Sequence, residues 1–217
     1  MFRDQCKVCG GVGIVKNDKG NNVECRCVVK DRIYYYLYPF LPFENKGFYH
    51  VQDINKELVR KKKDSFLPVK VVFRSNKANH EKTLSRYRNL LIMYLLDTNQ
   101  YDDYIILNIS DILDLYLSNR LDDDTFNFYN IKYSVIIVVM GTTGIHNKEE
   151  QNIISTFIET HKNKDLFFVV KKKQVTIDKW EFDEKTRSNV KVNRVHTKDY
   201  NYYKNIFKQY NFSTYAL

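Results

Sequence analysis

The sequence predicts an α/β fold in three layers, a parallel sheet between helices, with a small cysteine-bearing module in front of it. Two observations lead to this prediction. Short, continuous, β-branched apolar runs alternate with amphipathic segments from about residue 50 onward, and all four cysteines fall within the first 27 residues. Continuous apolar strands are typical of parallel sheets that are buried on both faces. We therefore expect the cysteine module and a linker over residues 1–48 and the α/β domain over residues 49–217.

The elements of the α/β domain follow one another in a regular order. The apolar runs predict strands near residues 69–73, 104–109, 134–139 and 166–170, because they are too short for helices and rich in Val, Ile and Phe. The segments around them predict helices, because their apolar residues recur three and four positions apart. These helical segments are "DINKELVRKKKDSF", "TLSRYRNLLIMYLLDTN", "SDILDLYLSNRL", "NKEEQNIISTFIETHKN" and, near the end of the chain, "NYYKNIFKQYNF".

The cysteines form two close pairs. Two residues separate Cys6 from Cys9, and one residue separates Cys25 from Cys27. In a reducing compartment such pairs bind zinc more often than they form disulfides, because four thiolates satisfy a tetrahedral Zn²⁺. Glycines at positions 10, 11 and 13 let the backbone turn tightly, with its amides free to donate to the sulfurs. We expect one closed, structural zinc site; a pair of redox dithiols is the alternative.

The charge of the chain favours contact with a polyanion. The net charge is +9, the pI is about 9.2, and 15% of the residues are aromatic. The alternative is a compositional bias, since abundant Lys, Asn, Tyr and Ile are what an AT-rich genome encodes. Two basic runs are candidate nucleic-acid contacts, with solvated faces as the alternative: Arg60, Lys61, Lys62, Lys63, and Lys171, Lys172, Lys173.

Membrane insertion and secretion are not expected. No apolar run approaches the roughly 18 residues that a membrane helix needs. The N-terminus "MFRDQCKVCG" also lacks the apolar segment of a secretion signal. The sequence therefore predicts a cytoplasmic protein.

The segment "NKANHEKT", residues 76–83, stands where a phosphate loop would join a strand to a helix. Lys82 and Thr83 match the end of the pattern G-x-x-x-x-G-K-[ST], but Asn76 and Glu81 occupy its glycine positions. Without glycine the backbone amides cannot approach a phosphate closely, and the Glu81 carboxylate repels it. We interpret Lys82 and Thr83 as a vestigial phosphate loop, with a chance match as the alternative.

The order of these motifs, two cysteine pairs, "PFENKGF", then the α/β core, resembles the DnaC/DnaI type of replicative helicase loader, AAA+ ATPases of bacteria and their phages. The resemblance implies an AAA+-like core, a phage or other mobile element as the source, and a replicative helicase or its loader as partner, in a hetero-oligomer. In that family the third core strand ends in the acidic residues that hold Mg²⁺. Here Val138 and Val139 occupy those places.

These departures predict a protein that acts in DNA replication by contact and is not an active enzyme. Two alternatives stay open. The first is a basic DNA-binding module, and the second is an active ATPase with an atypical phosphate loop.

Overall fold

The computed structural model describes residues 2–41, 51–65, 67–74, 80–117, 122–123, 126–127, 131–140, 148–170, 173–183, 187–198 and 200–216. Only the backbone is described for residues 80–83, 122–123, 126–127, 173–183 and 189–198. Within this part of the chain, no helix is both long enough and apolar enough to cross a membrane.

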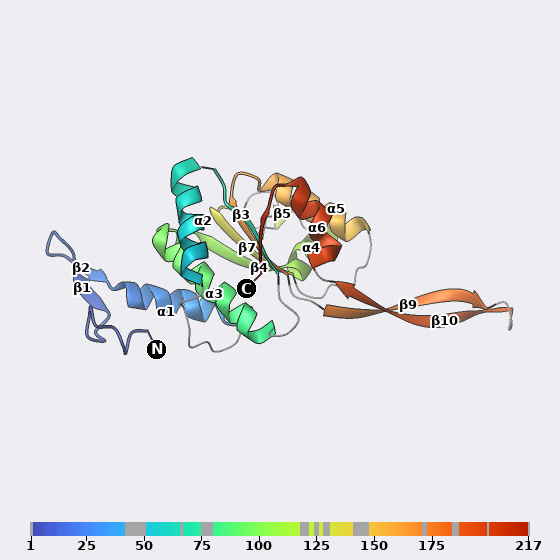
Figure 1. Ribbon diagram of the computed structural model, residues 1–217, viewed down its shortest axis with the longest axis horizontal. Helices are drawn as coiled ribbons and strands as arrows, with labels where there is room; N and C mark the ends of the chain where they lie inside the picture. The colour runs from blue at the N-terminus through green and yellow to red at the C-terminus, as the bar shows by residue number, and fades with distance from the viewer. Residues whose placement is uncertain are drawn as a thin grey trace.

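The centre of the protein is a parallel sheet of five strands (Figure 1). Neighbouring strands pair in parallel throughout, which requires a crossover connection between them. The predicted α/β fold and the four predicted strands are therefore confirmed. In order across the sheet, the strands are β11 (Ser213–Ala216), β3 (Lys70–Arg74), β8 (Asp165–Val170), β7 (Val135–Met140) and β4 (Tyr104–Asn108).

Helices cover both faces of the sheet, so the fold has three layers (Figure 1). One face packs against α1 (Arg26–Leu37), α2 (Gln52–Ser65) and α3 (His80–Asp97), and the other against α4 (Ile109–Leu117), α5 (Lys148–Thr160) and α6 (Tyr200–Gln209). The strands supply both cores because their side chains alternate between faces. In β7, for example, Val139 packs on the α1–α3 side and Val138 on the α4–α6 side.

A long antiparallel hairpin leaves the sheet after β8 and was not predicted. It consists of β9 (Lys173–Asp183) and β10 (Ser188–Lys198), which pair over eleven positions. Figure 1 shows this β9–β10 arm extending away from the sheet and its helices, on the side opposite the N-terminal module. Its strands lack a continuous apolar run, which is why the pattern that identified the core strands did not reveal them.

Two short hairpins complete the described structure. Strands β1 (Ile14–Lys16) and β2 (Asn22–Glu24) pair within the N-terminal module. Strands β5 (Asp122–Asp123) and β6 (Phe126–Asn127) pair between α4 and β7.

Candidate metal centre

The four cysteines come from two structural contexts. Cys6 and Cys9 lie in consecutive turns before β1, where Cys9 O accepts a hydrogen bond from Val12 N at 3.0 Å. Cys25 is the N-cap residue of α1, and Cys27 lies in the first turn of that helix. The β1–β2 hairpin connects these two contexts and brings them together.

Glycine is required at one position between them. Gly13 has φ +87°, in the left-handed region, and a Cβ atom there would meet Val28 Cγ2 at 2.9 Å. The tight turn allows Gly13 N to donate to Cys9 Sγ at 3.3 Å and Cys25 N to donate to Gly13 O at 2.9 Å. The expectation that amides at these glycines donate to the sulfurs is confirmed at Gly13.

The sulfur atoms form a compact cluster. All four lie within 4.8 Å of one another. The Sγ atoms of Cys6 and Cys25 are 3.8 Å apart, and those of Cys9 and Cys27 are 3.5 Å apart. A disulfide needs about 2.05 Å, so these thiols are free. Tetrahedral thiolates about 2.3 Å from a metal lie about 3.8 Å apart. The cluster can therefore hold a metal ion.

The thiols of the cluster differ in pKa. Burial opposes the loss of a proton from Cys9, but hydrogen bonds from Gly13 N and from the Cys27 and Cys6 thiols outweigh it and lower the pKa of Cys9 to about 6. Burial raises the pKa of Cys27, and so does its hydrogen bond to Cys9. Four neighbouring thiolates repel one another, so a bound cation is needed to remove the remaining protons.

Side chains around the cluster hold its loops. Arg3 Nε donates to Gly11 O at 2.8 Å, and the Arg3 guanidinium also reaches Val12 O at 3.1 Å. The carboxylate of Asp31, on α1, accepts from the backbone amides of Phe2 and Arg3 at 3.0 and 3.1 Å. Arg3 and Asp31 were not predicted from the sequence, because nothing in their spacing from the cysteines marks them.

Helix α1 joins the metal centre to the sheet domain. Its Arg26 and Arg32 form ion pairs with Asp97 at 2.9 Å and Asp102 at 3.0 Å, near the end of α3. On its buried side, Ile33 and Leu37 are fully enclosed in the core between α1, α3 and the sheet. The cysteine module is thus continuous with the core through α1.

The predicted phosphate-loop residues begin a helix. Lys82 and Thr83 lie in the first turn of α3, which follows β3, while their side chains and residues 75–79 lie outside the described part of the chain. Val138 and Val139 are at most 2% exposed within β7. Neither residue offers an oxygen to a cation.

The first basic run lies on α2 and is partly occupied by acidic partners. Lys61 Nζ pairs with Glu57 at 2.7 Å, and Lys62 Nζ pairs with Asp165 at 2.8 Å, whereas Arg60 and Lys63 are exposed. Of the second run, Lys171 and Lys172 lie outside the described residues, and Lys173 begins β9. The structure therefore does not gather the two runs into one described site.

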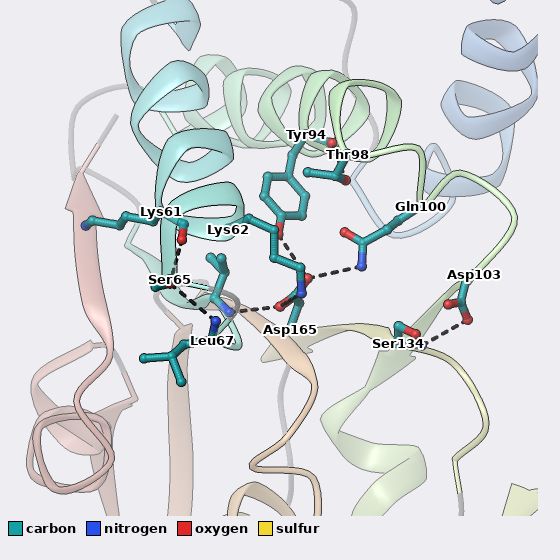
Figure 2. Close-up of polar contacts among 11 residues, drawn as sticks. Lys61, Lys62, Ser65, Leu67, Tyr94, Thr98, Gln100, Asp103, Ser134 and Asp165 are labelled. Atoms are coloured by element: carbon teal, nitrogen blue, oxygen red, sulfur yellow. Dashed lines mark hydrogen bonds and ion pairs between the residues drawn. The ribbon is translucent and has the colours of Figure 1, made fainter.

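Asp165, which was also not predicted from the sequence, is the centre of a buried polar network (Figure 2). Its side chain is fully buried at the start of β8 and accepts four hydrogen bonds. The donors come from four segments: Lys62 Nζ at 2.8 Å, Val69 N at 2.8 Å, Tyr94 OH at 2.9 Å and Gln100 Nε2 at 3.2 Å. An acidic residue directly before an apolar strand, as in "DLFFVV", is the only sequence signal of this network.

No protein-family model matches the sequence, and no curated protein is similar to it. Fold and site together define the class of protein. It is an α/β protein with a five-stranded parallel sheet, compatible with a P-loop-like core, and a four-cysteine cluster that can hold a metal ion.

Proposed function

We propose that the protein is a catalytically inactive relative of the DnaC/DnaI-type helicase loaders, with an AAA+-like core. It acts in DNA replication, in the cytoplasm of a bacterial host, through contact with a replicative helicase or its loader. The observation that carries this proposal is the combination of a P-loop-like parallel sheet with valines at the end of β7. In this proposal the sheet of a nucleotide-binding protein is kept, while the two valines near the end of β7 supply no side-chain group that could hold Mg²⁺.

The reasons for inactivity are electrostatic. Phosphoryl transfer depends on positioning and on charge stabilisation by backbone amides, Mg²⁺ and its carboxylate ligands. Val138 and Val139 fill the cores on the two faces of the sheet and provide no ligand for Mg²⁺. Losing one well-placed donor costs about 3 kcal/mol of transition-state stabilisation, so several losses together abolish turnover.

The metal in the cysteine cluster is proposed to be Zn²⁺. Four soft thiolates with tetrahedral spacing suit zinc, and a site closed by four protein ligands leaves no position for a substrate. Its role is structural: it fixes the turns around Cys6 and Cys9 to the start of α1. The metal thereby orders a surface that can contact a partner.

We place this contact on the cysteine module, where apolar side chains are exposed. Val8, Val12 and Ile14 are exposed to 78%, 65% and 53% of their areas. Several exposed apolar side chains on one small module are typical of a protein contact. Lys7 and Lys16 are exposed in the same module and would favour acidic residues on the partner.

A binding experiment with the replicative helicase of a bacterial host tests the contact. The purified helicase is immobilised, and the proteins are compared by biolayer interferometry. Val12→Asp is expected to weaken binding at least tenfold, because it places a charge in the apolar contact. Leu67→Asp is the matched control, since Leu67 is also 65% exposed but lies outside the module. Equal affinities for the two variants, or no binding of the wild type to helicase or loader, would refute the contact.

A nucleotide experiment tests inactivity. Isothermal titration with MgATP and a phosphate-release assay are expected to give no binding heat and no turnover. Micromolar binding that disappears in Lys82→Ala would show a working site, and the protein would then be an active ATPase with an atypical loop.

A further inference from the structure

The β9–β10 arm is a two-stranded sheet of its own. Among the described residues its strands pair only with each other, and both outer edges are left without a partner strand. Eleven residues at about 3.3 Å each give the arm a length of about 36 Å. An isolated two-stranded ribbon is marginally stable in water, so an arm of this length gains from a partner that binds along it.

The arm is basic. Its two strands include five Lys or Arg and three Asp or Glu, which gives a net charge of +2. The register puts Lys173 directly opposite Lys198, where the sheet domain joins the arm. Like charges in directly opposite positions destabilise a ladder. The sequence adds Lys171 and Lys172 immediately before this pair. A bound anion would relieve the repulsion at this end.

The register also sorts the charges by face. Residues two apart on one strand share a face, and so do directly opposite residues. One face of the half next to the sheet therefore holds four basic positions. These are Lys173, Lys179, Arg194 and Lys198. Glu181 and Asp183 share this face nearer the turn. The part of the arm that would attract an anion is therefore its inner half, which runs from Lys173 to Lys179 and spans about 20 Å.

We propose that the inner half of the β9–β10 arm binds the phosphate backbone of duplex DNA along the major groove. A two-stranded antiparallel ribbon fits this groove, which is about 12 Å wide. Twenty ångströms correspond to about six base pairs along the helix axis, because each step rises about 3.4 Å. The contacts are to phosphates and are independent of sequence.

Duplex DNA is favoured over a protein strand added to an edge of the arm. Natural sheets block edge pairing with charged residues, lysine above all, and both strands of the arm are charged: β9 carries both signs, and β10 carries Lys191, Arg194 and Lys198. The net positive charge instead matches a polyanion. The proposal goes beyond the contact with a helicase or loader and needs neither protein for its test.

The test uses the full-length protein and a fluorescein-labelled duplex of about 20 base pairs. Anisotropy titrations at several salt concentrations give the affinity and its salt slope. The double variant Lys179→Gln, Arg194→Gln is expected to lose on the order of 10- to 100-fold in affinity near 0.1 M salt. Its salt slope should fall by about 2, because each lost phosphate contact removes about 0.9. Thermal unfolding should be unchanged, because both residues lie on the arm and not in the core.

Two further variants remove the same charge elsewhere. Lys7→Gln, Lys19→Gln in the cysteine module and Arg60→Gln, Lys63→Gln on α2 should keep wild-type affinity within about threefold. Equal losses of DNA affinity in all three double variants would overturn the proposal in favour of an effect of net charge. A loss of affinity confined to the α2 variant would place the DNA site on α2. Tighter binding to the single strand of the same sequence would overturn the assignment to duplex.

The single tryptophan, Trp180, lies in β9 and provides an independent readout. Addition of unlabelled duplex is expected to change its emission with the same midpoint as the anisotropy titration. The register puts Trp180 on the face opposite the four basic positions, so an emission change whose midpoint differs from that of the anisotropy titration, and not an unchanged emission, would contradict binding along the inner half.

Discussion

Replacing Asp165 by alanine removes the acceptor that joins α2, the start of β3, α3 and the loop before β4. Four donors lose their partner, but not all of them remain unsatisfied. The Lys62 side chain is 29% exposed and can turn to water, and Gln100 is half-buried. Tyr94 OH and Val69 N stay inside, where each orphaned polar group costs about 1–3 kcal/mol. The expected loss in the free energy of unfolding is therefore about 4 kcal/mol.

Urea unfolding, followed by circular dichroism at fixed zinc concentration, measures this loss. The midpoint should fall while the m-value stays constant, because the surface exposed on unfolding is unchanged. Asp64→Ala, an exposed carboxylate on the same helix as Lys62, is the matched control and should change stability by less than about 0.5 kcal/mol. A loss below about 1 kcal/mol for Asp165→Ala would refute the reasoning. It would mean that water replaces the carboxylate as the common partner.

Three other predictions concern the metal, the pH and one glycine. Metal analysis should give about one equivalent of zinc in the wild-type protein. Cys25→Ser should lower the zinc content and the melting temperature together. Less than about half an equivalent in the wild type would contradict the site. Burial lowers the pKa of His161, so the unfolded chain binds a proton more readily, and stability should fall as the pH drops below about 6.5. Unfolding experiments between about pH 7.5 and 5 should show a weaker dependence in His161→Phe; an identical dependence would exclude His161 as its source. In thermal unfolding, Gly13→Ala should destabilise the zinc-bound protein by about 1–3 kcal/mol more than Gly20→Ala. Both glycines have positive φ, but only at Gly13 would an added Cβ collide with Val28. Equal losses would show that this collision is relieved at no cost.

The sheet and the cysteine cluster could be predicted from the sequence because their signals are local. The runs around Val71, Ile137 and Phe168 are apolar on both faces, as parallel strands between two layers of helices must be. The cysteines are close in sequence, and a metal that takes four thiolates explains their spacing without any knowledge of the fold.

The elements that were missed depend on distant parts of the chain. Strand β11 has the sequence "STYA", which gains its strand conformation by pairing with β3 at the edge of the sheet. In the sequence Asp165 is an ordinary polar residue at the start of an apolar strand, and only the fold brings Tyr94 and Lys62 to it. The strands of the β9–β10 arm lack a continuous apolar run, and their short alternations, Val175 with Ile177 and Val190 with Val192, are too brief to distinguish them from a loop.

The position of Cys25 as the N-cap of α1 limits how the protein can change in length during evolution. An insertion between Cys25 and Cys27 would rotate one of the sulfurs away from the metal, because both are fixed by the first turn of a helix that is buried against α3. The turn from Asn17 to Asn21 is exposed and is closed by hydrogen bonds of its own, including Asn21 N to Asn17 Oδ1 at 3.0 Å. Homologues should therefore vary in the number of residues between β1 and β2, while the interval of one residue between the second pair of cysteines stays constant.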